Sequence, residues 1–335
     1  YRRHAMILPR GVGGGQSSTA PIVNGDIGFS FSPGGLLLPY HMGVADCLVR
    51  AGYLDPSRTV IAGSSAGAIA AMAIGCGLDP LLGLEGTIAI SDRCRSASMS
   101  ARGNLLPLLE EQMESLVDDE AFEFLRSRRR RARADGAGYE DEKTGTGVAL
   151  AYREVFPRGK SHFETTFETR ADLFRAVGYS CMFPFFTTNF PCAIDFGGTA
   201  AQNADVEAPR LPRLLVDGYF AMPRPQFGCP VLETEFPDAG VARTVAIACI
   251  PQGLFGMDAV FENDVGTEEG GSNNLISIDG DGEEDPMGLT DIFRIATQPT
   301  SRKELTGLFE RGYRDAERWC HREEDINNIK RDLRN

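Results

Sequence analysis

The chain has 335 residues, of which 42% are hydrophobic and 24% charged, and its formal net charge at pH 7 is −13. A chain of this length and hydrophobic content can bury a substantial core, and we interpret it as one large domain with insertions. The acidic balance argues against a nucleic-acid-binding protein, and no uninterrupted apolar segment approaches the ~20 residues that a membrane-spanning helix needs.

The first 25 residues are predicted to be a flexible tail. Residues 11–19 read Gly-Val-Gly-Gly-Gly-Gln-Ser-Ser-Thr, a composition typical of linkers. These glycines do not predict a phosphate-binding loop, because no Lys-Ser/Thr pair or helical pattern follows them. The chain starts without Met, so removal of an organellar targeting segment is one interpretation of this start.

A buried strand, a glycine-rich loop and a helix are the first predicted elements. Residues 26–32 form an apolar strand pattern, Gly34 and Gly35 follow, and residues 40–51 have helical spacing. Such a loop exposes several backbone N–H groups in one direction, which can stabilise an oxyanion without a charged side chain. The alternative is a plain turn, in which the glycines only satisfy unusual backbone angles.

The next motif, Gly-Ser-Ser-Ala-Gly at residues 63–67, lies between an apolar strand pattern and a run of small residues. A strand, an abrupt turn and a helix are the context of a nucleophile elbow. The backbone folds tightly around the serine, so the positions two before and two after must be small. Gly63 and Gly67 meet this requirement for Ser65, whereas Ser64 has no such flanks. Ser65 is therefore the candidate nucleophile, and a packed turn of small residues is the alternative.

The middle and the end of the chain supply further elements. Residues 105–117 have helical periodicity, residues 147–152 and 162–168 alternate as strands do, and residues 241–250 form a buried strand pattern. Strands that alternate with helices predict a mixed, largely parallel sheet between helical layers. Residues 301–334 predict a long helix whose interspersed charges indicate a mostly solvated face.

Two insertions are predicted from composition. The first, at about 126–146, opens with the basic run Arg126–Arg133 and continues rich in glycine. We interpret it as a solvated loop, with contact to anionic lipid headgroups or an acidic partner as the alternative. The second, at about 262–287, is rich in Asp, Glu and Gly and predicts a mobile acidic loop.

A carboxylate is predicted at the end of another buried strand, where Asp217 and Gly218 follow the apolar residues 214–216. With no imidazole between them, Asp217 would accept the proton of Ser65 directly as general base. An ordinary Asp-Gly turn is the alternative.

A Ser-Asp-His triad is the competing architecture, since Ser65, Asp217 and His321 follow the chain order of α/β-hydrolases. His321 lies in a charged helical run, however, and is predicted to be a solvated helix residue. We interpret His41 as structural and His162 as exposed, so the Ser-Asp dyad is favoured.

The eight cysteines show neither Cys-x-x-Cys spacing nor a partnered histidine, which argues against a zinc site or a disulfide framework. Cys47, Cys181 and Cys249 lie in apolar runs and are interpreted as small core residues. We therefore expect no metal and a reducing intracellular compartment such as cytosol or plastid stroma.

In this order the motifs resemble the patatin-like phospholipases, most closely the branch containing adipose triglyceride lipase and adiponutrin. The matching segments are residues 30–44, 61–71, 171–186, 214–218 and 308–316. The resemblance implies a patatin-like three-layer α/β/α sandwich over residues 26–335, with a mixed, mostly parallel central sheet. It also implies activity without a cofactor.

By the same resemblance, the protein is expected to be a serine lipid acyl hydrolase that forms an acyl-enzyme. Ser65 and Asp217 would form the catalytic dyad, and Gly34, Gly35 and Leu36 the oxyanion hole. The substrates implied are glycerolipid esters, namely phospholipid, galactolipid or triacylglycerol, at a membrane or lipid-droplet surface.

The chain departs from the family pattern near the oxyanion loop. Pro33 replaces the first family glycine and offers no N–H, and Leu37 and Leu38 replace an arginine and a fourth glycine. Tyr219 replaces the small residue after the Asp-Gly pair. We expect an altered rather than absent oxyanion hole. The alternative is a silent patatin-like subunit that binds lipid or a protein partner, through Arg126–Arg133 or the C-terminal helix, within a larger assembly.

A cluster of four phenylalanines has two interpretations; its members are Phe183, Phe185, Phe186 and Phe190. They are candidates to line a channel for an acyl chain. Membership of the core is the favoured interpretation, because aromatic clusters are usually buried.

Overall fold

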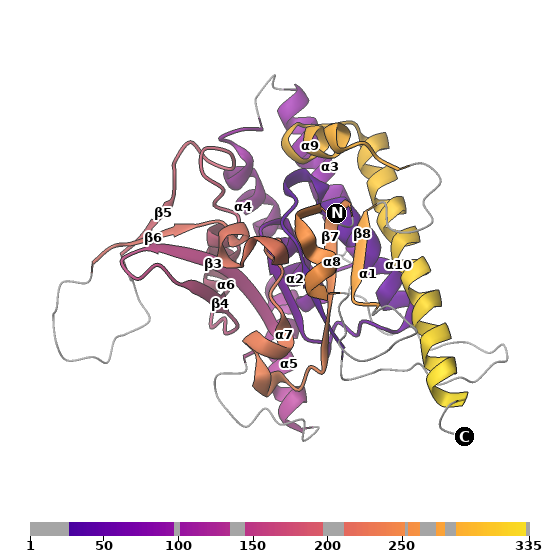
Figure 1. Ribbon diagram of the computed structural model, residues 1–335. Coiled ribbons are helices and arrows are strands. Elements are labelled where there is room, and N and C mark those ends of the chain that lie inside the picture. The colour runs from indigo at the N-terminus through magenta and orange to yellow at the C-terminus, as the bar shows by residue number, and fades with distance from the viewer. Residues whose placement is uncertain are drawn as a thin grey trace.

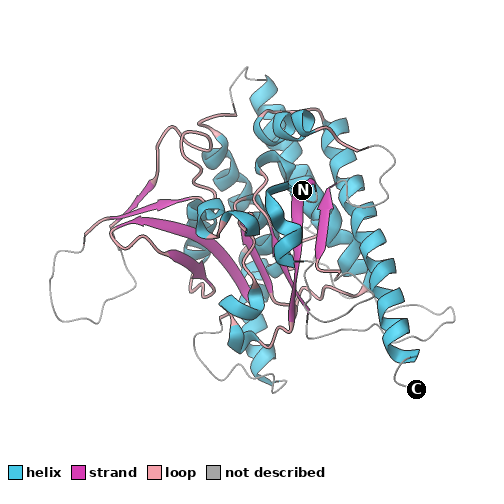
Figure 2. Ribbon diagram, viewed as in Figure 1, coloured by secondary structure: helices cyan, strands magenta, loops and turns pink. Residues whose placement is uncertain are grey.

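The computed structural model describes residues 27–96, 101–134, 145–196, 211–251, 254–261, 273–278 and 286–332. The tail expected at residues 1–25 lies outside the described residues. Within them, one eight-stranded sheet is covered by helices on both faces (Figure 1 and Figure 2). The α/β/α sandwich with a mixed, mostly parallel sheet is therefore confirmed.

The sheet has the strand order β5-β6-β3-β2-β1-β7-β8, and β4 pairs with β3 beside this path. The pairs β1–β2, β1–β7, β2–β3 and β7–β8 are parallel, and β3–β4, β3–β6 and β5–β6 are antiparallel. The strands are β1 (Ile27–Phe31), β2 (Ile61–Ser64), β3 (Val148–Phe156), β4 (Ser161–Glu164), β5 (Ala193–Asp195), β6 (Arg213–Val216), β7 (Arg243–Pro251) and β8 (Leu275–Ile278).

The pairing of β1 with β2 brings the two sequence motifs together. Phe31 at the end of β1 is in register with Gly63 near the end of β2. Because parallel strands end at the same edge of a sheet, the glycine-rich loop and the serine turn leave the sheet side by side. The fold thus places the two motifs next to each other.

The helices are α1 (Leu38–Ala51), α2 (Ala66–Gly75), α3 (Pro80–Ser96), α4 (Leu105–Leu116), α5 (Asp119–Ala134), α6 (Arg170–Ser180), α7 (Leu232–Glu235), α8 (Met257–Phe261), α9 (Leu289–Thr297) and α10 (Arg302–Asp332). Alternate residues of β1 face the two helical layers. Phe29 meets Trp319 of α10 edge to face at 6.1 Å. A side chain on Gly28 would instead strike Leu232 of α7.

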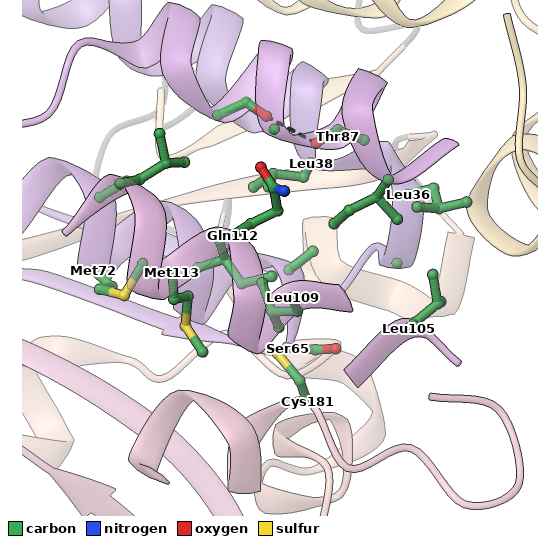
Figure 3. A pocket seen from close by; sticks show the side chains of 18 of the residues that line it. Leu36, Leu38, Ser65, Met72, Thr87, Leu105, Leu109, Gln112, Met113 and Cys181 are labelled. Carbon is green, nitrogen blue, oxygen red and sulfur yellow. Dashed lines mark hydrogen bonds between the residues drawn. The ribbon is translucent and has the colours of Figure 1, made fainter. Parts of the chain in front are cut away.

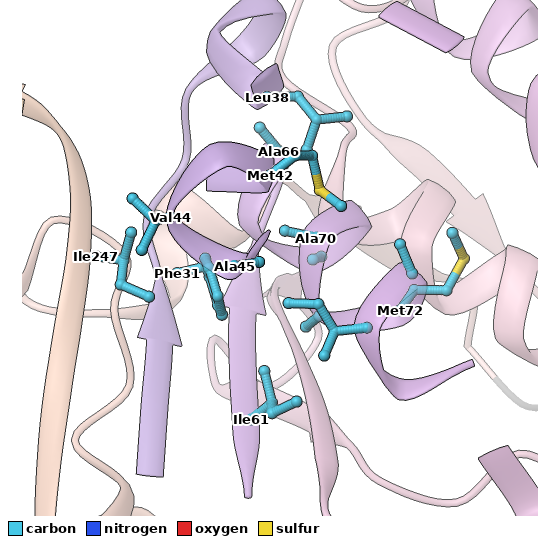
Figure 4. Close-up of a cluster of buried hydrophobic side chains, with 14 of the residues drawn as sticks. Phe31, Leu38, Met42, Val44, Ala45, Ile61, Ala66, Ala70, Met72 and Ile247 are labelled. Carbon is cyan, nitrogen blue, oxygen red and sulfur yellow. The ribbon is translucent and has the colours of Figure 1, made fainter. Parts of the chain in front are cut away.

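The main core lies between the sheet and the layer that contains α1 and α2 (Figure 4). α2 consists of small and apolar residues and is buried along most of its length, as expected of a helix that is apolar all round. Its small side chains let it approach the sheet closely. A Cβ atom on Gly75 would lie 2.6 Å from Val148 Cγ2 on β3.

α1 and α10 touch through their backbones at two glycines. A Cβ atom on Gly43 would lie 1.9 Å from Phe309 O, and one on Gly312 would lie 2.1 Å from Tyr40 O. Both distances are shorter than any real Cβ contact. The crossing of these helices therefore requires glycine at both positions.

The expectation that α10 is mostly solvated is correct for only one side of the helix. Trp319, Leu305 and Leu308 are fully buried, and Trp319 Nε1 donates to Asn273 O at 2.7 Å. The opposite side carries exposed residues such as His321. The many charges of this segment obscure its buried stripe in the sequence. The stripe needs few apolar residues, because a single indole contributes a large buried area.

The two predicted insertions contain regular structure. The basic run Arg126–Arg133 forms the end of α5, where the buried Arg128 donates to the backbone oxygens of Pro56, Thr59 and Thr146. Strand β8 falls inside the segment predicted as an acidic loop, because its apolar residues extend the sheet beside β7. Residues 135–144, 262–272 and 279–285 lie outside the described residues. In the part that is described, no helix is long and apolar enough to cross a membrane.

Two alanine substitutions in α10 are expected to have opposite effects on stability. Gly312→Ala should lower the free energy of unfolding by about 1–3 kcal/mol, because the new methyl group overlaps Tyr40 O. Gly307→Ala has nothing within 4 Å of its Cβ and should raise that free energy by about 0.5–1 kcal/mol. Chemical denaturation of both variants measures this, and equal effects would contradict the close α1–α10 contact.

Candidate active site

The turn between β2 and α2 holds Ser65 in a strained backbone conformation. Its φ is 54° and its ψ is −120°, a region that non-glycine residues rarely adopt. A Cβ atom on Gly63 would lie 2.0 Å from Gly67 O, and one on Gly67 would lie 2.1 Å from Phe31 O. The small flanking residues predicted from the sequence are therefore sterically required, and Ser65 stands at the tip of a tight strand-to-helix turn with the backbone geometry expected of a nucleophile elbow.

Ser180, the last residue of α6, supports this turn from below. Its Oγ accepts a hydrogen bond from the Ser65 backbone N–H at 2.9 Å and donates to Ala151 O of β3 at 2.6 Å. Ser180 is fully buried. Ser180 lies in one of the segments that resemble the family, but the sequence analysis assigned it no role, because only the fold brings α6 next to this turn.

Asp217 lies at the end of β6 and is fully buried. Its Oδ1 accepts a hydrogen bond from Tyr219 N–H at 2.8 Å, whereas its Oδ2 has no hydrogen-bond partner among the described residues. Burial raises the pKa of Asp217 from 3.8 to about 7, and interactions with Tyr219 N–H and the Ser65 hydroxyl partly offset this rise. The Ser65 hydroxyl thus lies near enough to lower the pKa of the carboxyl group, but it makes no hydrogen bond to Oδ2.

The glycine-rich loop forms a tight 3₁₀ turn, η1 (Gly35–Leu37), between β1 and α1. Gly35 has a φ of +56°, and its Cβ would lie 2.4 Å from Ala296 O of α9. A Cβ on Gly34 would lie 2.6 Å from Cys249 Sγ of β7. Neither position can hold a side chain, so the turn is closely backed by the last third of the chain.

The first N–H groups of a helical turn have no partner within that turn. In η1 the turn's own hydrogen bond runs from Leu37 N–H to Gly34 O at 3.0 Å. Gly35 and Leu36 border the same cavity as Ser65, whereas Gly34 does not. Of the three predicted oxyanion donors, two therefore lie at the cavity that contains the serine.

His41 fixes the start of this turn from the core. Its Nε2 lies 2.8 Å from Ser32 O, and burial lowers the pKa of His41 to about 4. A neutral ring must donate through Nε2 to meet a carbonyl oxygen. His41 is thus buried in a structural position, as predicted. His321 is exposed on α10 and does not border the cavity.

An apolar cavity of about 90 Å³, partly open to solvent, extends from Ser65 between α2, α3 and α4 (Figure 3). Its walls include Leu36, Met72, Leu105, Leu109, Met113 and Cys181. Besides Ser65, the polar residues Thr87, Gln112 and Thr187 line it, and the Thr87 hydroxyl donates to Gly83 O. This apolar lining suits a hydrocarbon chain.

The core interpretation is wrong for three of the four phenylalanines, whereas Phe186 packs against the buried cluster that contains Leu36 and Leu105. Phe183, Phe185 and Phe190 are 38%, 52% and 68% exposed, and Phe186 is half-buried. None of the four borders the cavity. The cavity is instead built from helices that carry no distinctive motif, so sequence reasoning missed it.

His162 is also not exposed as predicted. It is half-buried, stacks on Tyr152 at 5.2 Å and lies 2.9 Å from the buried Glu154. Arg213 at the start of β6 contacts the same carboxylate at 3.0 Å. This cluster joins β3, β4 and β6 and so anchors the strand that carries Asp217.

All eight cysteines are free. Cys47 and Cys249 are buried in the core as predicted, and Cys181 is buried at the cavity wall. Among the described residues no cluster of His, Cys, Asp or Glu side chains is arranged to hold a metal ion.

The family model of the patatin-like phospholipases matches residues 29–227. No curated protein matches the chain significantly. Among solved structures, the crystal structure of VipD from Legionella pneumophila matches with a TM-score of 0.40 and 12% sequence identity, and the match covers 88% of this chain and 67% of that chain.

Asp217→Asn is expected to stabilise the protein in a pH-dependent way. The folded pKa of about 7 exceeds the ordinary value of 3.8, so the folded state binds more protons between these values. The contribution of Asp217 to the free energy of unfolding therefore falls as the pH rises from about 4 to about 7. The variant should gain up to about 4 kcal/mol over wild type at pH 8 and much less at pH 5. Denaturation at both pH values measures this, and a gain independent of pH would contradict a buried, raised pKa.

Proposed function

Because the chain belongs to the patatin-like phospholipase family, whose model matches residues 29–227, we propose that it is a lipid acyl hydrolase with a Ser65–Asp217 dyad. The observation that carries the proposal is a single constellation. The strained Ser65 borders an apolar cavity, and the η1 turn (Gly35–Leu37), which we call the oxyanion turn, borders the same cavity. A buried Asp217 with a pKa of about 7 lies near the Ser65 hydroxyl.

In the proposed reaction, Ser65 Oγ attacks the ester carbonyl and Asp217 Oδ2 takes the hydroxyl proton. The N–H groups of Gly35 and Leu36, with that of Gly34 close by, would bind the oxyanion. The alkoxide then leaves with the proton from Asp217, and an acyl-enzyme remains. Water, deprotonated by Asp217, attacks this ester, and Ser65 recovers its proton as the fatty acid is released. A pKa near neutrality suits a group that takes and returns a proton.

The substrate class is proposed to be glycerolipid esters, either phospholipid, galactolipid or triacylglycerol. The cavity supports this class, because its lining is apolar and it begins at Ser65. The resemblance to the branch of adipose triglyceride lipase adds support from sequence. Leu37, where the family has arginine, is buried in the core and leaves no charge there. Lipid surfaces in a reducing compartment are the proposed place of action, and the eight free cysteines accord with it.

Ser65→Ala is expected to abolish both labelling by a fluorophosphonate probe and ester hydrolysis. Ser64→Ala is the matched control, because the Ser64 hydroxyl donates to Gly228 O and Ser64 does not border the cavity. In the wild type, kcat/KM for a soluble ester should rise with pH up to about 7 and then level off, as Asp217 loses its proton. Lack of labelling in the folded wild type would favour the silent lipid-binding alternative.

Gly86→Leu is expected to change the preferred length of the acyl chain. Gly86 borders the cavity on α3, and its Cβ would meet only Leu116 and Gln112, at 3.6 and 3.7 Å. A leucine there would fill the cavity, so kcat/KM for a long-chain ester should fall about 10-fold or more while a butyrate ester is spared. Gly86→Ala makes only ordinary contacts and is the control. Equal loss on both esters would contradict the assignment of the cavity to the acyl chain.

A further inference from the structure

Large apolar side chains gather on the surface near the oxyanion turn. They come from the loop after α6, from η3 (Gly218–Ala221) and from α9. Their exposed fractions range from 38% to 68%. We call them the docking face, and its members are Phe183, Phe185, Phe190, Phe220, Leu289 and Phe293. Contiguous exposed apolar side chains of this kind mark interaction sites rather than ordinary surface.

Two of the three segments, α9 and the loop after α6, meet at Gly35, and η3 packs against that loop. The Cβ position of Gly35 lies 2.4 Å from Ala296 O of α9 and 3.8 Å from Phe186 in the loop after α6. Phe183 in that loop stacks on Phe220 of η3 at 5.5 Å. Phe220 N–H in turn donates to Asp217 O at 3.1 Å. The docking face therefore adjoins both the oxyanion turn and the carboxylate.

The loop after α6 is built to present its aromatic side chains outward. Phe185 has a φ of +56°, which is strongly disfavoured for a bulky residue. Its N–H donates to Phe190 O at 3.1 Å, and its carbonyl oxygen accepts from Arg102 Nε at 2.8 Å. The backbone thus holds a half-exposed phenyl ring in a strained conformation, a feature that is concentrated at functional sites.

The charged side chains beside the α9 part of the docking face do not form a basic patch. Arg294 of α9 pairs with Glu304 at 2.8 Å and with Asp291 at 3.5 Å. The whole chain carries a net charge of −13. A surface of this kind gains from apolar contact and gains nothing from anionic headgroups, because attraction to anionic lipid requires a basic patch.

We propose that the docking face inserts into a neutral lipid surface, so that the mouth of the cavity at Gly35 opens directly onto the lipid. This inference rests on the proposed function for the identity of the occupant. An acyl chain leaves an assembled lipid most easily when it passes from one apolar environment to another. Gly35 is partly exposed and borders the cavity, so the face surrounds the point at which a chain would enter.

Sedimentation with phosphatidylcholine vesicles tests the docking face. Phe293→Ser and Leu289→Ser should each weaken binding about 10-fold, because each removes an apolar group from the lipid contact. Leu81→Ser is the matched control, since Leu81 and Leu289 are both 44% exposed in the first turn of a helix. Leu81 lies at the start of α3, outside the docking face, and its substitution should leave binding unchanged.

Two further measurements separate this inference from the proposed function. Ser65→Ala should bind the vesicles as the wild type does, and Phe293→Ser should retain hydrolysis of a soluble butyrate ester while losing activity on vesicles. Vesicle binding that depends on Phe293 without any ester hydrolysis would support the docking face and overturn the proposed function. Unchanged vesicle binding by Phe293→Ser, or binding that requires phosphatidylserine and disappears in salt, would overturn the docking face.

Discussion

The structure depends on a backbone contact between two neighbouring strand ends. Gly67 in the first turn of α2 lies against Phe31 O, and Gly63 lies against Gly67 O, with no room for a methyl group at either place. This contact forces the residue between them into a positive φ. The parallel pairing of β1 and β2 then sets the oxyanion turn beside the proposed nucleophile. The geometry of the site is thus fixed by main-chain packing, not by side-chain hydrogen bonds alone.

Local signals in the sequence predicted much of the fold and the residues of the candidate dyad. Gly63 and Gly67 stand where no larger residue fits, and Asp217 directly follows an apolar strand pattern. The tight turn and the position of the carboxylate could therefore be predicted from a few neighbouring residues. The cavity could not be predicted in this way, because it forms where α3 and α4 meet α2. The sequences of these helices do not show which helices they pack against. Phe183 and Phe190 show a second limit, since apolar character alone does not separate a core residue from an exposed one. Trp319 shows the converse, a fully buried side chain inside a charged segment.

Burial of Asp217 links the proposed chemistry to stability. A carboxylate at the surface would have a pKa near 3.8 and would be a weak base, whereas the buried one reaches about 7. The same desolvation makes the ionised form unfavourable in the folded protein. The surrounding structure, including the Glu154–Arg213 cluster that anchors β6, holds the group there despite this cost.

The family match ends at residue 227, but the backing of the oxyanion turn comes from later in the chain. Cys249 of β7 lies behind Gly34, Ala296 of α9 lies behind Gly35, and α10 clamps α1 directly after the turn. A fragment that ended at residue 227 would keep both candidate catalytic side chains and lose the wall against which the turn rests. The matched segment and the part of the chain that holds the turn in place therefore have different boundaries. A substitution in the last third of the chain can thus displace the turn while Ser65 and Asp217 stay unchanged.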